Sequence, residues 1–202
     1  TVWHDRAPHN LTDVFGMTYN QCTRPNGHVS VEFAGTLAKT PASDAQALIE
    51  LVTPFDGTDV LASYGHYAWK NYAAVTRHGF GKGDAEWIAT LLDADTIRAV
   101  LREAVEHAGI ADAGTALAGQ VTVRRGTNAR GEQVTYLLNY SADEVTINSP
   151  VSGDVVVAPV VVGTDGTVDE SATAAIALKE GSKVEVGDRL TIGRWNVVVI
   201  AG

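Results

Sequence analysis

The chain has 202 residues, enough for one large domain or two small ones that fold without disulfide or metal support. Its 15 Lys and Arg residues against 24 Asp and Glu residues give a formal net charge of −9, which disfavours binding to nucleic acid or to an anionic membrane. The single cysteine, Cys22, excludes an internal disulfide and a zinc cage built from cysteines. No apolar run approaches the roughly 18 residues that a membrane span needs.

Residues 1–112 mix short strand-like runs with helical signals, and this mixture favours an α/β layer structure. A short helix is expected to begin at Thr40-Pro41, because proline is favoured at the first helical position. The runs that predict strands lie at residues 29–33, 47–54, 60–63, 73–76 and 85–91.

Residues 93–108 carry the clearest helical pattern, with Asp93 as a suitable N-cap and Gly109 as a left-handed C-cap. The apolar residues recur at the spacing of one helix face, namely Ile97, Val100, Leu101, Ala104, Val105 and Ala108. Arg102 and Glu103 are then expected to tolerate alanine. We expect the helix to pack on a sheet through Ile97, Leu101, Ala104 and Val105.

Small, weakly patterned residues at 113–118 predict a linker between two domains. From Gly119 onward the helical period is absent, and short runs separated by turn residues predict an all-β antiparallel sandwich over 119–202. Its strands are expected at residues 121–123, 134–139, 145–147, 154–162, 174–178, 183–186, 190–192 and 196–200.

Two segments have some features of ligand-binding loops. Gly79–Gly83 is rich in glycine and contains Lys82, but no Ser or Thr follows the lysine as a phosphate loop requires, so we predict a tight turn between strands. His4, Asp5 and His9 are close in sequence, yet they lack the spacing of a zinc site. We therefore assign no metal and no cofactor to this chain.

The sequence also shows no motif that identifies a catalytic residue. Cys22 could be a nucleophile with a histidine base, but its surroundings, NQCTRP, show neither a nucleophile elbow nor a helix start, so a buried or incidental thiol is expected. The histidines considered as its base are His28, His66 and His78. Paired carboxylates could hydrolyse glycosides, but nothing places any two of four candidates across a cleft: Glu32, Glu50, Asp56 and Asp59. No catalytic residue is assigned.

An aromatic cluster with His66 among its members spans nine residues, and it consists of Tyr64, Tyr67, Trp69 and Tyr72. Aromatic rings of this kind pack within a domain, anchor subunit contacts or stack on ligands. The residues alone leave these three roles open. The sequence as a whole indicates a non-catalytic assembly region with two domains.

An ordered motif lies between residues 56 and 101. It comprises DGTDVLASYG, then Ala74-Val75-Thr76-Arg77, Phe80-Gly81-Lys82-Gly83, Trp87, Thr90, Leu92 and Asp93. The motif resembles the family 42 glycoside hydrolases, the bacterial β-galactosidases, with His78 in place of a more usual Asn. The flanking sequence is also similar to this family, upstream at Asp5 and residues 11–17 and downstream at residues 121–125 and 136–140.

In that family a TIM barrel with two catalytic glutamates precedes a trimerisation domain and a small β domain. The resemblance implies that residues 1–112 are the second half of an α/β trimerisation domain, flavodoxin-like or amidotransferase-like, and that 119–202 are the C-terminal β domain. It further implies a non-catalytic assembly region of a homotrimer whose absent barrel hydrolyses terminal β-D-galactosides with retention.

The N-terminal segment TVWHDRAPHN has no signal-peptide pattern, and together with the lone cysteine it favours a cytoplasmic parent from which this chain is a fragment. Two other functions stay open. A free-standing carbohydrate-binding or adhesion module would use the aromatic cluster and the β half. A small enzyme in its own right would need a convergent set of nucleophile, base or metal ligands.

Overall fold

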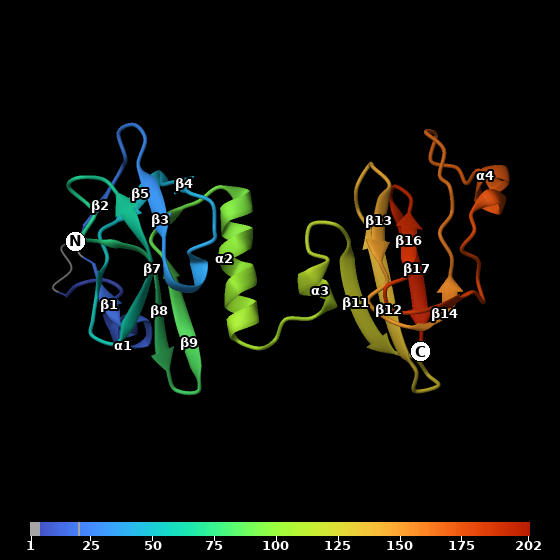
Figure 1. Cartoon of the computed structure of the whole chain (residues 1–202), viewed down its shortest axis with the longest axis horizontal. Coiled ribbons are helices and arrows are strands. Elements are labelled where there is room, and N and C mark those ends of the chain that lie inside the picture. Colours follow the sequence, from blue (N-terminus) through green and yellow to red (C-terminus); the bar gives the residue numbers. More distant parts are fainter. Residues whose placement is uncertain (1–4, 20) are drawn as a thin grey trace. The chain divides into compact units, whose positions relative to one another are not determined.

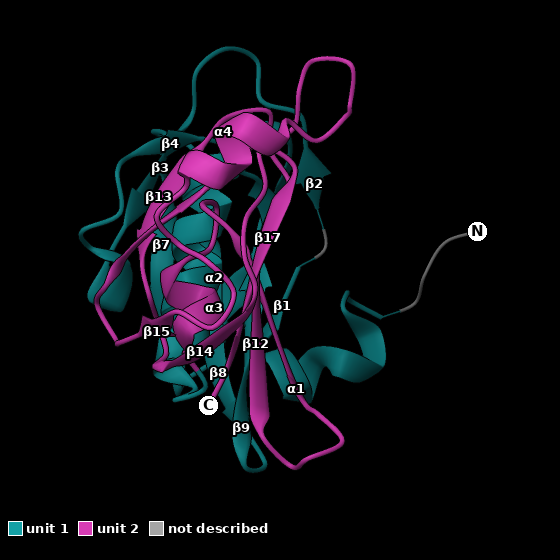
Figure 2. Ribbon diagram, turned by 90° about the vertical axis from the view of Figure 1, so that its right-hand side faces the viewer, with its two compact units in different colours: residues 1–110 teal, residues 111–202 magenta. Residues whose placement is uncertain are grey.

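The computed structural model describes residues 5–19 and 21–202. The chain divides into two compact units, unit 1 with residues 1–110 and unit 2 with residues 111–202 (Figure 2). Each unit has its own hydrophobic core. None of the helices in the described ranges is long and apolar enough to cross a membrane.

Unit 1 is built on a five-stranded antiparallel sheet with the strand order β4-β3-β7-β8-β9 (Figure 1). These strands are β3 (Ser30–Phe33), β4 (Ser43–Asp44), β7 (Thr58–Gly65), β8 (Ala73–Phe80) and β9 (Gly83–Ile88). Two smaller antiparallel sheets accompany it. In one of them, β5 (Gln46–Glu50) lies between β10 (Thr90–Leu91) and β2 (Cys22–Thr23) and pairs with both. The other pairs β1 (Met17–Thr18) with β6 (Thr53–Pro54).

The helices of unit 1 are short except for α2 (Ala94–His107). The others are α1 (Thr12–Phe15) and the 3₁₀ helices η1 (His9–Leu11) and η2 (Gly35–Leu37). The core gathers apolar side chains from the main sheet, from β5 and from α2, including Val31, Ile49, Leu61, Tyr64, Val75 and Val100. Helix α2 therefore packs on the sheet, as the sequence predicts.

The capping of α2 is confirmed, and Leu101 is the residue of the predicted buried face that is wrong. Asp93 accepts hydrogen bonds from the backbone N–H groups of Asp95 and Thr96, and Gly109 has a φ of 68°. The helix buries Thr96 and Val100, whereas Leu101 is 55% exposed. The N-cap and an ion pair from Glu103 to the sheet, described below, turn the Thr96–Val100–Glu103 side inward, and Leu101 then lies on the flank.

Unit 2 contains a five-stranded antiparallel sheet, β11-β12-β17-β14-β15, and a two-stranded sheet, β13-β16. The strands are β11 (Thr122–Thr127), β12 (Gln133–Asn139), β13 (Val145–Asn148), β14 (Gly153–Val157), β15 (Lys183–Val184), β16 (Arg189–Ile192) and β17 (Asn196–Ala201). Helix α3 (Ala113–Ala116) lies in the segment expected as a linker, and α4 (Glu170–Ala175) follows β14.

The core of unit 2 joins both of its sheets, since Leu137, Val198 and Ile200 of the larger sheet pack with Ile147 and Ile192 of the smaller one. Strand β17 lies between β12 and β14 and is buried on both faces. Its continuous apolar run, residues 197–201, is typical of such a central strand.

Several predicted elements need correction. No helix begins at Thr40-Pro41: η2 precedes it and β4 follows it, because Ser43 pairs with Val31. The strand predicted at 174–178 does not form: residues 174 and 175 end α4, whose N-cap Asp169 accepts a hydrogen bond from the Ala172 N–H, and residues 176–178 belong to no strand. The antiparallel β structure predicted for 119–202 is confirmed. In unit 1, where the sequence favours an α/β layer structure, the strand pairs of the described residues are antiparallel as well.

Candidate functional site

The structure gives Cys22 an exposed position on β2 and does not join it to a histidine base. His28 Nδ1 lies 2.7 Å from Asp44 Oδ2, and His78 Nδ1 lies 3.1 Å from Thr58 Oγ1. His66 stacks on Trp69, with 4.1 Å between the ring centroids. None of these three contacts is with the Cys22 thiol.

Of the three N-terminal candidates for metal binding, the structure describes Asp5 and His9. His9 Nδ1 lies 3.0 Å from Asp5 Oδ1, whereas His4 lies outside the described residues. Across the described ranges, no group of three or more His, Cys, Asp or Glu side chains is placed to hold a metal ion.

Gly79–Gly83 forms the tight turn that the sequence predicts. Phe80 at the end of β8 pairs with Gly83 at the start of β9, so the loop contains two residues, Gly81 and Lys82. Gly81 has a φ of 62°, the left-handed conformation that such a hairpin requires at its first loop position.

The four candidate carboxylates differ in their surroundings. Glu32, Asp56 and Asp59 are exposed, and Glu50 accepts a hydrogen bond of 2.7 Å from the indole Nε1 of Trp87. Trp87 also makes an edge-on contact with Phe15 at 4.9 Å between ring centroids. Glu50 therefore fixes an aromatic side chain between β5 and β9.

The aromatic cluster divides into a buried part and an exposed part. The hydroxyl of Tyr64 donates to the carbonyl oxygens of Glu50 and Ala89, and burial together with the nearby Glu50 carboxylate raises its pKa. Trp69 and Tyr72 pack against the unit 1 core, whereas Tyr67 is 88% exposed. Most of the cluster thus serves packing within the domain.

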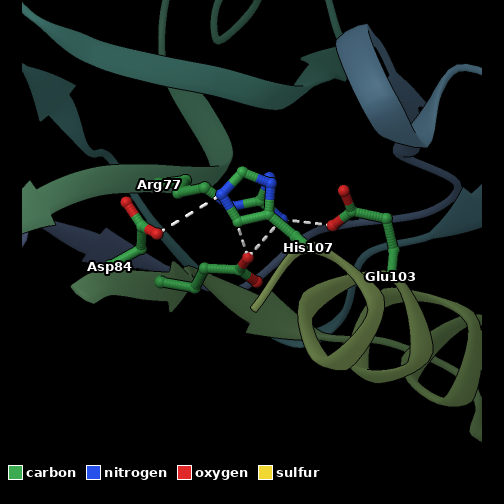
Figure 3. A network of polar contacts seen from close by, with 5 residues as sticks. Arg77, Asp84, Glu103 and His107 are labelled. Carbon is green, nitrogen blue, oxygen red and sulfur yellow. Dashed lines mark hydrogen bonds and ion pairs between the residues drawn. The ribbon is translucent and has the colours of Figure 1, made fainter. Parts of the chain in front are cut away.

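The strongest polar feature of unit 1 is an ion-pair network beneath α2 (Figure 3). The guanidinium of Arg77, on β8, donates from Nε to Glu86 Oε1 at 2.6 Å and from Nη2 to Glu103 Oε2. Arg77 is only 4% exposed, and its two carboxylate partners are largely buried. At the end of α2, His107 Nε2 lies 3.3 Å from Asp84 Oδ2.

This network joins helix α2 to strands β8 and β9. Burial opposes the charge on both partners, but their mutual attraction outweighs it: the pKa of Arg77 is raised, and the pKa of Glu103 is lowered by Arg77 and by a hydrogen bond from Thr36. The expectation that Glu103 is a tolerant surface residue is therefore wrong. Its carboxylate compensates a buried positive charge, which is costly to leave unpaired.

Sequence reasoning missed this network because its members are 26 and 9 residues apart and come from three elements. Arg77 stood in the ordered motif, but nothing in the motif identified its partners. The available signal was weak: Glu103 borders the apolar stripe of the helix on the side of Val100.

Unit 1 also leaves large apolar side chains on its surface although its core is well formed. Leu48 and Leu91 are exposed on the paired strands β5 and β10, and Leu101 and Ile110 are exposed on α2 and just after it. The outer edges of β4 and β9 have no further strand in the described sheet. Surfaces of this type are suited to contact with further protein.

Comparison with known families finds a match for unit 1. Residues 1–111 match the family described as "Beta-galactosidase trimerisation domain". A curated relative, the β-galactosidase BgaA of Planococcus sp. (strain 'SOS Orange'), is 33% identical over 92 residues. That match covers 46% of this chain and 13% of the relative.

Solved β-galactosidases have a similar fold over almost all of this chain. The enzyme from Rahnella sp. R3 aligns with a TM-score of 0.71 and 18% identity over 100% of this chain, and the enzyme from Bacillus circulans sp. alkalophilus with a TM-score of 0.68 and 18% identity over 98%. The enzyme from Halorubrum lacusprofundi gives a TM-score of 0.65 and 19% identity. This chain spans 26%, 26% and 25% of these three chains.

Proposed function

Because the chain belongs to the β-galactosidase trimerisation domain family, we propose that it is the non-catalytic assembly region of a β-galactosidase. The match of residues 1–111 to that family carries the proposal. The small share of its relatives that the chain spans, 13% and about one quarter, is consistent with an assembly region that accompanies a separate catalytic domain.

In this proposal, residues 1–112 form the second half of an α/β trimerisation domain of the flavodoxin-like or amidotransferase-like kind, 113–118 connect the units, and 119–202 form a C-terminal β-sandwich. The open edges of the main sheet of unit 1 are where the first half would add strands. The exposed apolar side chains of unit 1 would then be covered by that half or by neighbouring subunits of a homotrimer.

The parent enzyme would hydrolyse terminal non-reducing β-D-galactosides. Its two glutamates would lie in a barrel domain, one acting as nucleophile and the other as acid and base, which retains the anomeric configuration. In this proposal the chain contributes assembly and the catalytic groups belong to the barrel domain.

Two measurements test the proposal. The purified chain should release no nitrophenol from a nitrophenyl β-galactoside under conditions in which an intact β-galactosidase does, and turnover by the chain would contradict the proposal. In sedimentation velocity the chain should associate, and the double variant Leu91→Asp/Leu101→Asp should shift it toward monomer. Val186→Asp, at an exposed valine of unit 2, is the matched control and should leave the distribution unchanged.

A further inference from the structure

The segment between β2 and β3 of unit 1 connects the three-stranded sheet to the main sheet. It contains the sequence Pro25-Asn26-Gly27, three residue types that turns favour. Asn26 and Gly27 form a bend, and both are exposed to solvent. An asparagine side chain thus stands next to a glycine backbone nitrogen at the surface of the molecule.

The bend leaves both reacting groups free to move. Gly27 has a φ of 95°, and apart from its chain neighbours no heavy atom of the described residues lies within 4 Å of the place where a Cβ would stand. In the same described ranges, no hydrogen bond holds the side chain of Asn26 or the N–H of Gly27. The side-chain carbon of Asn26 and the following backbone nitrogen can therefore approach each other.

The other asparagines differ from Asn26 in sequence and in their hydrogen bonds. Of the eight in the chain, Asn26 is the one followed by glycine, whose missing side chain leaves the backbone nitrogen uncrowded. Asn128 Oδ1 accepts from the N–H groups of Arg130 and Glu132. Asn139 is 1% exposed, and its Nδ2 donates to three carbonyl oxygens.

From this arrangement we propose that Asn26 and Gly27 form a self-modification site, at which the folded chain converts asparagine to aspartate and isoaspartate without an enzyme. In the first step the backbone nitrogen of Gly27 attacks Cγ of Asn26. The bond from this nitrogen to Cγ forms and the bond from Cγ to Nδ2 breaks. The proton of the Gly27 N–H leaves with Nδ2 as ammonia, and a five-membered cyclic imide remains.

In the second step water opens the imide at one of its two carbonyl carbons. Attack at Cγ breaks the new bond and gives aspartate in an ordinary backbone. Attack at the main-chain carbonyl carbon breaks the original peptide bond and gives isoaspartate, in which the backbone runs through Cβ and Cγ. Water is consumed and ammonia is released, while no group is oxidised or reduced.

Both products place a new carboxylate at the edge of unit 1. The residue two positions further, His28, has its Nδ1 2.7 Å from Asp44 Oδ2 on the outer strand β4. The formal net charge of −9 becomes more negative by one unit. Because the fold does not use the polar groups of Asn26 and Gly27, modified chains should stay folded and accumulate beside unmodified ones. This reaction needs nothing from an assembly role.

Peptide mass spectrometry of the intact folded chain, held for several weeks at pH 7 and at pH 9, tests the site. The peptide that contains Asn26 should gain about 1 Da, since an acid replaces an amide. It should separate into two products of equal mass, of which an isoaspartyl carboxyl methyltransferase with S-adenosylmethionine labels one. The reaction should be several-fold faster at pH 9, because the attacking nitrogen must lose its proton.

The same measurement on chain unfolded in guanidinium chloride separates the fold from the sequence. Asn26 should react in the folded chain within about threefold of its rate in the unfolded chain, because the fold does not restrain it. Asn128 and Asn139 should react at least about tenfold more slowly than Asn26 in the folded chain, since their hydrogen bonds hold them.

The variant Asn26→Gln keeps a neutral amide but would have to close a six-membered ring, so the more acidic form should cease to accumulate in ion-exchange chromatography. Asn148→Gln is the matched control, because Asn148 is exposed on β13 and is followed by Ser149. It should acquire the acidic form at the rate of the original chain.

Three results would overturn the proposal. One is a mass gain at Asn26 that is no faster than the gain at Asn128 or Asn148 in the folded chain. Another is protection of Asn26 by folding that exceeds about threefold. The third is an unchanged rate of acidic-form accumulation in Asn26→Gln. Hydrolysis of galactosides and association of the chain are not affected by any of these outcomes.

Discussion

In unit 1 the principal buried polar group is the guanidinium of Arg77, whereas in unit 2 it is the neutral amide of Asn139. Arg77 makes ion pairs with two carboxylates, from β9 and from α2. Asn139, 1% exposed, makes its hydrogen bonds almost entirely with backbone groups of two turns. The first group docks a helix on a sheet, and the second shapes two loops.

The difference lies in what is left when one partner is removed. Removing a charge from an ion pair leaves another charge in a region of low dielectric, which costs more than leaving a neutral group unsatisfied. An ionic network also depends on pH, whereas an amide does not titrate. Loss of either group should therefore destabilise its unit by a different amount and with a different dependence on pH.

The largest effect is expected for Arg77→Met. The variant keeps much of the side-chain volume but leaves the carboxylates of Glu86 and Glu103 largely buried without their cation. We expect unit 1 to lose about 3–5 kcal/mol of stability. Hydrogen exchange of the β8 amides during a urea series measures this loss within unit 1 alone.

Arg98→Met is the matched control, because Arg98 lies on the same helix and pairs with Asp95 in an exposed position. It should change the stability of unit 1 by no more than about 0.5 kcal/mol. Similar losses for both variants would show that the position of Arg77 in the structure is wrong.

A smaller loss is expected for Asn139→Ala in unit 2. The carbonyl oxygens of Asp143, Ile192 and Gly193 would lose their shared donor. The expected cost is about 2–3 kcal/mol, read from exchange of the β12 and β17 amides. Asn148→Ala, at an exposed asparagine of β13, should cost less than about 0.5 kcal/mol. A cost for Asn139→Ala equal to that of Arg77→Met would remove the distinction between the two units.

The rotation of α2 gives a third prediction. Val100→Ala should destabilise unit 1 by about 2 kcal/mol, because Val100 is fully buried in the core. Leu101→Ala removes more carbon atoms but should cost at most about 0.5 kcal/mol, since Leu101 is mostly exposed. Thermal unfolding of both variants decides between the predicted and the observed helix face; a larger loss for Leu101→Ala would restore the face expected from the sequence.

The sequence predicted the features that depend on local pattern. The ends of α2 follow from Asp93 and Gly109, the hairpin turn follows from Gly81, and most strands follow from their apolar runs. The helix period also located the apolar side of α2 to within one residue. It could not distinguish Val100 from Leu101 because both belong to a stripe wider than the contact with the sheet.

What the sequence could not predict depends on long-range pairing. Arg77 and Glu103 meet because a strand and a helix dock, and Asn139 reaches Gly193 across 54 residues. The alanine-rich segment at 170–175 has weak strand and weak helix signals, and the Asp169 cap decided the outcome. Tyr140 and Trp195 likewise become neighbours only through the pairing of β12 with β17.

The smallest effect concerns pH and separates the charge of Glu103 from its hydrogen bonds. The pKa of Glu103 is lowered in the folded chain, below its ordinary value of 4.5. A carboxylate of this kind stabilises the fold fully above its ordinary pKa, and the contribution is lost as the pH falls through the lower folded value. Glu103→Gln keeps the side-chain shape, so it should cost unit 1 only about 1 kcal/mol at neutral pH.

That cost should shrink on acidification below pH 4.5, because the wild-type carboxylate is protonated first in the unfolded chain and, at its lower pKa, later in the folded chain. Other carboxylates with lowered pKa values, including Asp93 in unit 1 and Asp165 in unit 2, make the pH slope of either unit an unreliable test by itself. The difference between wild type and Glu103→Gln removes their contribution. Glu106→Gln, at an exposed position on the same helix, should show no such convergence, and a constant cost for Glu103→Gln across the acid range would mean that its charge does not stabilise α2.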